Sequence, residues 1–193
     1  MQTGVMDHSV TLFMVLLGCK PKGRNTEQHD IFFGIGKDLK NLKGQINAFW
    51  PDAGEKIHID AWREVNTVGS YQIKVRLKDH KQPPSQGHRL FFINLGGYKR
   101  EEFEEYHYKM LVVAEDKGQA VKEAKQTAFF KHFGFKGAES HVDDKYGIDV
   151  DDVYDVEDVL PDGLKNKYAI QLEYNHPLVK DNLVLGYLRL SKI

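Results

Sequence analysis

The sequence predicts an α+β fold made of two tandem repeats, each ordered strand–strand–helix–strand–strand and packed with pseudo-twofold symmetry. Two observations lead to this prediction. The chain matches itself at an offset of 78 residues, and each copy combines apolar or alternating strand patterns with one helical pattern. A length of 193 residues suffices for one large domain or two small ones.

The internal match begins with residues 12–30, which align without a gap to residues 90–108. Six of these 19 positions are identical, whereas about one identity is expected by chance. Shorter matches follow in the same order at offsets of 80, 83, 91 and 97. They pair "AFW" 48–50 with "AFF" 128–130, His58-Ile59-Asp60 with His141-Val142-Asp143, 64–68 with 155–159, and 71–73 with 168–170. Because the offsets only grow, the second copy reads as the first with longer loops.

The strands and the helix of the first copy follow from local patterns. Residues 12–17 are continuously apolar and end at Gly18, which is typical of a buried strand, and "HDIFFGIG" predicts a second strand. Asp38 begins a helix that Pro51 ends, because the residue before proline avoids helical angles. The stretches "KIHIDAW" and "YQIKVRL" alternate as strands do. Alternation in the first of them predicts His58, Asp60 and Trp62 on one side.

The repeat also predicts the domain organisation. Residues 1–10 form an N-terminal tail, 11–78 the first repeat, 79–88 a linker and 89–193 the second repeat. In the second copy a helix is expected near 116–132, and the acidic stretch near 143–158 is interpreted as a solvated insertion. A last strand near 183–190 is expected to complete a sheet edge.

The stretch "TLFMVLLGCK" has two interpretations, a lipoprotein cleavage site at Cys19 or an ordinary strand. Its twin at 90–96 lies deep inside the chain, and residues 1–10 contain no Lys or Arg, so the strand is favoured. A single cysteine excludes an internal disulfide and a thiol-rich metal site, which fits a reducing, cytoplasmic setting. A net charge of −1 argues against a nucleic-acid partner, and no apolar run has the length of a membrane span.

Several motifs of the chain resemble an uncharacterised bacterial family, domain-of-unknown-function family 1543. The shared pattern is a strand ending in Leu-Gly, a Glu-x-His-Asp, a helix, a His-Ile-Asp-x-Trp and a Tyr-x-Ile strand. In this sequence these are Leu17-Gly18, Glu27-Gln28-His29-Asp30, His58-Ile59-Asp60-Ala61-Trp62 and Tyr71-Gln72-Ile73. The family has one or two copies per chain, in keeping with the repeat, but in the second copy Tyr108 replaces the Asp and the Trp is lost. The resemblance implies no catalytic residues, because the family has no assigned function.

The candidate site residues are histidines and carboxylates spaced two apart, which places each pair on one face of a strand. They are Glu27, His29, His58 and Asp60 in the first copy, and Glu105, His107, His141 and Asp143 in the second. Two imidazoles with carboxylates can bind iron or another divalent metal, or can act as general acid and base. Alternatively, these groups anchor loops by hydrogen bonds to backbone amides. Trp62 either lines a pocket or fills the seam between the copies, and the seam is favoured.

From the sequence we therefore expect a small-ligand-binding or protein-binding module. The alternative is a metal-dependent or acid/base enzyme that uses the Glu-x-His and His-x-Asp strands. The pattern identifies no particular metal, cofactor, catalytic residue or oligomeric state.

Overall fold

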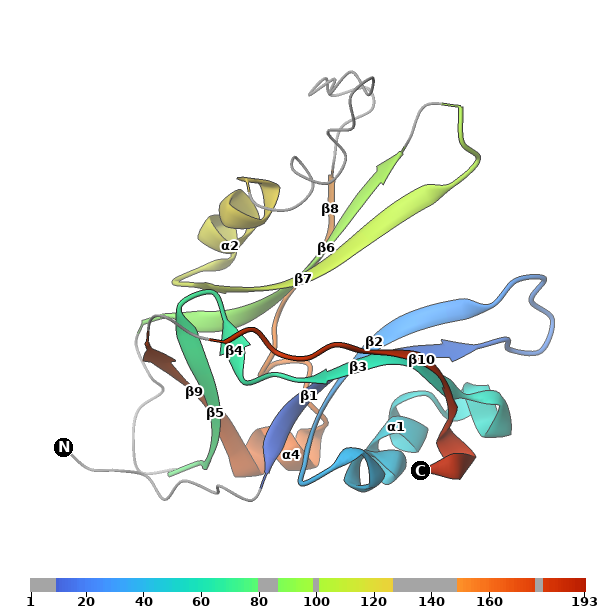
Figure 1. The fold of residues 1–193 in the computed structure, drawn as a ribbon, viewed down its shortest axis with the longest axis horizontal. Helices are drawn as coiled ribbons and strands as arrows, with labels where there is room; N and C mark the ends of the chain where they lie inside the picture. Colours follow the sequence, from blue (N-terminus) through green and yellow to red (C-terminus); the bar gives the residue numbers. More distant parts are fainter. Residues whose placement is uncertain (1–9, 80–86, 99–100, 127–148, 176–178) are drawn as a thin grey trace. The chain divides into compact units, whose positions relative to one another are not determined.

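The computed structural model describes residues 10–79, 87–98, 101–126, 149–175 and 179–193 (Figure 1). In this part of the chain the fold is mixed, with a four-stranded sheet, two three-stranded sheets and a few short helices. The α+β prediction is therefore confirmed. The chain divides into two compact units, a first unit of residues 1–83 and 159–193 and a second unit of residues 84–158. Among the described residues, no helix combines the length and apolarity needed to cross a membrane.

The first unit contains a four-stranded antiparallel sheet in the order β10-β3-β1-β2 and a smaller sheet in the order β4-β5-β9. Its strands are β1 (Thr11–Cys19), β2 (Gln28–Gly36), β3 (His58–Glu64), β4 (Thr67–Val68), β5 (Tyr71–Leu77), β9 (Tyr168–Tyr174) and β10 (Val184–Arg189). Its helices are the 3-10 helices η1 (Leu39–Leu42), η2 (Pro51–Lys56) and η4 (Leu190–Lys192), and the α-helices α1 (Lys43–Phe49) and α4 (Asp162–Lys167).

The core of the first unit lies on one face of the four-stranded sheet, against α1. Alternate residues of β1 point into it, and Leu42 and Ile46 cover them from the helical segment. Burial of each such side chain contributes roughly 1.5–3 kcal/mol. The segment starts as expected, with the Asp38 carboxylate accepting a hydrogen bond from the Asn41 backbone N–H at 3.1 Å. The opposite face also buries apolar residues, among them Leu12, Phe33 and Ile35, and carries Gly18 toward its other end.

The second unit consists of the strands β6 (Arg89–Tyr98), β7 (Glu105–Ala114) and β8 (Asp149–Asp155), in the sheet order β7-β6-β8, and the helix α2 (Lys117–Ala124). Asp116 caps α2 through a 2.8 Å hydrogen bond from the Gln119 backbone N–H. Ala120 and Ala124 are buried against the sheet. The part of the predicted helix beyond residue 126 lies outside the described residues.

Matching contacts in the two units determine which residues correspond. Asp38 and Asp116, which cap the helical segments of the two units, are 78 residues apart. The same offset relates the buried residues Leu42 and Ala120, and likewise Ile46 and Ala124. In the strands, Phe13 faces Glu64 while Phe91 faces Asp155, so β3 corresponds to β8 at an offset of 91. The helices of the two units therefore align at the same offset of 78 as the first strands, an alignment that the sequence alone left uncertain by a residue or two.

This register changes the interpretation of the acidic stretch near 143–158. The prediction of a solvated insertion is wrong for Asp149–Asp155, which form β8 beside β6. Apolar residues at 150 and 153 pack against the core of the second unit, and this pairing with β6 outweighs the acidic composition. The offset of 91 aligns Asp149 and Asp151 with His58 and Asp60. The predicted counterparts, His141 and Asp143, lie outside the described residues.

The closing strands of the two predicted repeats pair with each other in the first unit. The β5–β9 register is symmetric about Lys74 and Gln171, which are 97 residues apart and directly opposite. The predicted last strand also exists as β10, and it pairs with β3 at the sheet edge. Because these hydrogen bonds join β9 and β10 to earlier strands, residues 159–193 belong to the first unit rather than to the unit of β6–β8. Pseudo-twofold packing of the complete copies stays a prediction.

Cys19 provides a simple check on the first unit. Its side chain is fully buried at the end of β1, its Sγ lies 3.6 Å from the Ala53 carbonyl, and burial raises the pKa of the thiol. We expect the native protein to resist a thiol-specific reagent such as Ellman's reagent, and one thiol to react after denaturation in guanidinium chloride. A Lys22→Cys variant, with an exposed added thiol, serves as the reactive control. Rapid labelling of native Cys19 would contradict the position of β1.

Candidate functional site

The four candidate side chains of the first copy form a ring of short contacts. His58 Nε2 lies 3.0 Å from Glu27 Oε1 and 3.4 Å from Asp60 Oδ1. His29 Nε2 lies 3.3 Å from Asp60 Oδ2 and 3.8 Å from Glu27 Oε2. Each carboxylate therefore reaches both imidazoles, one with each oxygen. We refer to these four residues as the first-unit cluster.

Gly18 makes this convergence possible. It lies on the central strand β1, where it is directly opposite His29 of β2 on one side and His58 of β3 on the other. Directly opposite residues share a face of the sheet, so both imidazoles rise above Gly18. A Cβ atom at this position would lie within 3.0 Å of His58 Nε2 and of Asp60 Oδ2. The cluster therefore occupies the space that a side chain at position 18 would fill.

A β-bulge at Asp60 brings the second carboxylate to the same face. Leu16 faces Ala61 and Leu17 faces Ile59, so Asp60 is the extra residue of β3 and has no partner on β1. A bulge interrupts alternation and re-aims the side chains that follow it. As a result, Trp62 does not share the face of His58. It packs on the core side, with its ring centroid 6.1 Å from that of Phe13, so the predicted face shared by His58, Asp60 and Trp62 is wrong, and the favoured place of Trp62 in a seam between the copies stays a prediction.

His58 is held in one tautomer. Its side chain is only 4% exposed, and its Nδ1 lies 3.2 Å from the backbone carbonyl of Lys56. A carbonyl can only accept a hydrogen bond, so Nδ1 carries the proton and neutral His58 presents the lone pair of Nε2 to the cluster. Metal-binding histidines are typically fixed in this way, through a hydrogen bond from the other ring nitrogen.

The polar atoms of the cluster are not satisfied by the rest of the protein. Within the described part of the chain, the buried His58 Nε2 and Asp60 Oδ2 have no hydrogen-bond partner, because their short contacts lack hydrogen-bond alignment. An unsatisfied buried polar group costs about 1–3 kcal/mol. Of the alternative in which these groups anchor loops through the backbone, the described contacts show only the one between His58 Nδ1 and the Lys56 carbonyl.

The separations of the donor atoms suit a coordinated cation. A metal–ligand bond of about 2.1 Å puts neighbouring donors about 3.4 Å apart in a tetrahedron and about 3.0 Å apart in an octahedron. Three of the four nitrogen–oxygen distances, 3.0, 3.3 and 3.4 Å, lie in this range, and the fourth is 3.8 Å. Glu27 and His29 are each 44% exposed, so an ion could enter from solvent and retain positions for water or another ligand.

Tyr187 covers one side of the cluster. Its ring centroid lies 4.4 Å from that of His58, with 35° between the ring planes. Strand β10 has a bulge between Leu185 and Leu188, and Tyr187 belongs to this bulge. Sequence reasoning missed Tyr187, since β10 carries no signal of its neighbour β3. It also missed the role of Gly18, although the identity of Gly18 and Gly96 in the two copies was a visible signal.

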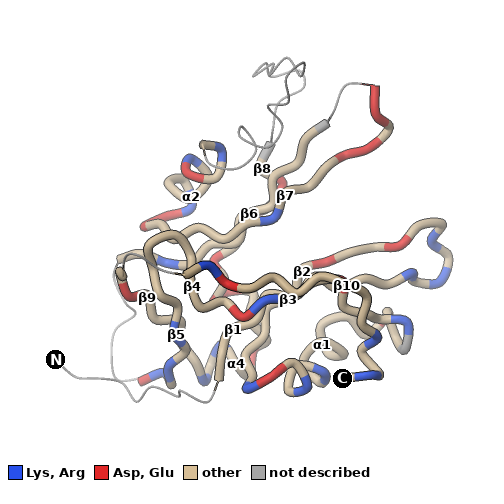
Figure 2. Tube along the Cα trace, viewed as in Figure 1, with Lys and Arg blue, Asp and Glu red and all other residues tan. Residues whose placement is uncertain are grey.

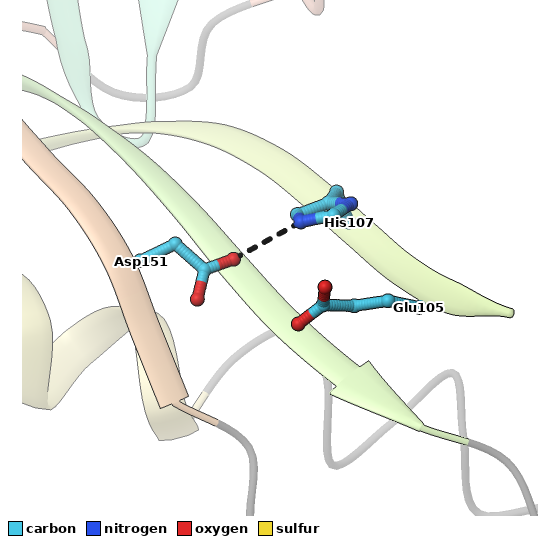
Figure 3. Close-up of side chains that lie close together, drawn as sticks. All are labelled: Glu105, His107 and Asp151. Atoms are coloured by element: carbon cyan, nitrogen blue, oxygen red, sulfur yellow. Dashed lines mark ion pairs between the residues drawn. The ribbon is translucent and has the colours of Figure 1, made fainter. Parts of the chain in front are cut away.

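A related set of side chains lies in the second unit. Glu105 and His107 of β7 and Asp151 of β8 point toward one another above β6, and each offers a donor atom within 4.8 Å of the others (Figure 3). Asp151 was not a candidate from the sequence. Extending the offset of 91, already visible at residues 64–68, back along the strand would have aligned it with Asp60.

Comparison with known protein families identifies the segment that carries the first-unit cluster. Residues 24–75 match DUF1543, a domain of unknown function. The resemblance predicted from the motifs is thus confirmed, and the DUF1543 segment contains all four residues of the first-unit cluster. The chain is also similar in structure to protein Il1583 from Idiomarina loihiensis, with a TM-score of 0.61 and 25% sequence identity over 94% of this chain and 98% of that one. No curated protein matches the chain significantly.

A substitution at Gly18 tests the geometry of the cluster. In Gly18→Ala the new methyl group would collide with His58 and Asp60, so we expect a loss of about 1–3 kcal/mol in the free energy of unfolding, measured with urea. The matched control is Gly44→Ala in α1, where a Cβ meets nothing within 4 Å. That variant should be neutral or more stable by up to about 1 kcal/mol. Equal stability of the two variants would show that the space above Gly18 is not filled as described.

Proposed function

We propose that the first-unit cluster binds a divalent transition-metal ion through Glu27, His29, His58 and Asp60. The observation that carries the proposal is the buried Nε2 of His58, which has no hydrogen-bond partner among the described residues, while Nδ1 of the same ring faces the Lys56 carbonyl. Glu27 and Asp60 approach this atom to 3.0 and 3.4 Å, and the second imidazole, that of His29, lies 3.3 Å from the other Asp60 oxygen. Two nitrogen and two oxygen donors favour Zn²⁺, Fe²⁺, Co²⁺ or Ni²⁺ over Mg²⁺ and Ca²⁺.

The number of open coordination positions decides between a catalytic or ligand-binding role and a purely structural one. Four protein ligands would close a tetrahedral Zn²⁺ site, as in structural zinc sites, whereas a six-coordinate Fe²⁺, Co²⁺ or Ni²⁺ would keep two positions for water or substrate. The exposure of Glu27 and His29 supports access to such a position. A bound ion would act there as a Lewis acid on water or on a small ligand, which connects the proposal with both functions expected from the sequence.

Acid/base catalysis without a metal is the second candidate. It is supported by the 3.0 Å contact between His58 Nε2 and Glu27 Oε1, a distance at which a proton could pass between the groups. The unaligned geometry of that contact makes it weaker than the metal proposal. The two candidates differ in one observable, namely whether the purified protein retains a stoichiometric ion.

Metal binding can be measured directly on the full chain. After removal of metals with a chelator, titration with Co²⁺ or Zn²⁺ should show a tight site, followed by calorimetry and by the visible spectrum of Co²⁺. The variants His29→Gln and Glu27→Gln should weaken this site by on the order of 100-fold, since even loss of an outer hydrogen-bond partner of a ligand costs 10–100-fold. Both residues are partly exposed, so these variants are expected to fold.

The control for this titration is His88→Gln, an exposed histidine outside the cluster, which should bind Co²⁺ as the wild type does. Absence of a tight site in the wild type would refute the metal proposal and leave the acid/base candidate. Equal Co²⁺ affinity of His29→Gln and the wild type would show that the ion binds elsewhere.

A further inference from the structure

The cluster of the second unit repeats the construction of the first. Glu105 and His107 occupy the β7 positions that correspond, at an offset of 78, to Glu27 and His29 of β2. Asp151 is the extra residue of a bulge in β8, because Leu95 faces Val150 while Asn94 faces Asp152. Asp60 has the same position in β3. Strand register, and not sequence similarity alone, therefore relates the two sets of side chains.

A glycine on the central strand again leaves the space. Gly96 of β6 lies opposite His107, and a Cβ atom at Gly96 would lie within 3.0 Å of the Asp151 carboxylate. His107 Nε2 lies 3.2 Å from Asp151 Oδ2, a separation that again suits two donors of one ion (Figure 3).

One donor differs between the units. The position of His58, opposite the central glycine, is taken in β8 by Asp149. At this register position the second unit therefore has no histidine, and the donors of the cluster among the described residues are one nitrogen and two carboxylates. Because oxygen donors suit hard cations and imidazole suits later transition metals, this exchange changes the preferred ion.

The surroundings differ in charge as well (Figure 2). The β1–β2 hairpin carries Lys20, Lys22 and Arg24, whereas the described residues that lead into β7 include Glu101, Glu102 and Glu104. Glu102 accepts a hydrogen bond from the Tyr106 hydroxyl, and this bond raises the pKa of Tyr106. Lys99 and Arg100 lie outside the described residues. The acidic side chains beside Glu105 favour the approach of a cation.

We propose that Glu105, His107 and Asp151 form a second divalent-cation site that discriminates less than the first between Zn²⁺ and hard ions such as Mn²⁺. This inference extends the proposed function to the second unit and rests on it through the shared strand register. Absolute affinity for Zn²⁺ exceeds that for Mn²⁺ at most protein sites. The distinguishing quantity is therefore the ratio of the two affinities, which should be lower at the second site by about 10-fold or more.

The test uses full-length variants that each weaken one site by on the order of 100-fold. In His29→Gln, titration with Mn²⁺, with free Mn²⁺ followed by electron paramagnetic resonance, should show one remaining site. Adding His107→Gln or Glu105→Gln to this background should abolish it. Conversely, His107→Gln alone should retain the tight Co²⁺ and Zn²⁺ site of the first unit. Zn²⁺ and Mn²⁺ affinities measured in the two single variants give the two ratios.

Each outcome bears on one proposal. Absence of Mn²⁺ binding in His29→Gln, or Mn²⁺ binding that survives both second-unit substitutions, overturns the second site. Equal Zn²⁺-to-Mn²⁺ ratios in the two single variants overturn its distinct preference. Loss of the tight Co²⁺ site in His107→Gln, with Mn²⁺ binding intact in His29→Gln, would instead refute the first-unit proposal. Circular dichroism of each variant verifies folding, and Glu105→Gln replaces His107→Gln if the latter unfolds.

Discussion

The absence of a side chain at Gly18 is the constraint on which the candidate site depends. Neighbouring strands of a sheet lie about 4.8 Å apart, so side chains from the two outer strands of a triplet meet only above a residue that leaves the space empty. His29 and His58 lie on either side of this glycine, and their imidazoles approach the same two carboxylates. Any larger residue at this position would separate the two histidines.

One face of the four-stranded sheet carries the apolar core, whereas the other combines buried apolar residues such as Leu12 and Phe33 with the polar cluster. On one face, β1 and the helical segment bury a continuous apolar core, which supplies the favourable free energy of folding. That surplus can offset the cost of holding His58 buried and Asp60 out of regular pairing on the other face. Local features that reduce stability concentrate at functional sites, because a stable scaffold tolerates them there. A bound cation would supply the partner that these polar atoms lack.

Corresponding hydrogen bonds support a common plan for the two predicted repeats. Val65 N–H donates to the Leu12 carbonyl at 2.8 Å, and Val156 N–H donates to the Leu90 carbonyl at 2.9 Å. A central glycine and a bulged aspartate also recur at matching register positions. At the register position of His58 the second unit has Asp149, so the two proposed sites would differ in residue chemistry while sharing one arrangement of strands.

Much of the fold and the identity of the four first-unit cluster residues were accessible from local sequence patterns. Apolar runs identified β1 and β2, Asp38 marked the start of the helical segment, and the two-residue spacing placed Glu27 beside His29. These features depend on alternation and capping, which act between residues close in the chain. The convergence of β2 and β3 on Gly18, the bulge at Asp60 and the turn of Trp62 into the core were decided by the tertiary structure. A bulge arises from hydrogen bonding to a partner strand, and that partner is distant in the sequence, so no local pattern could reveal it.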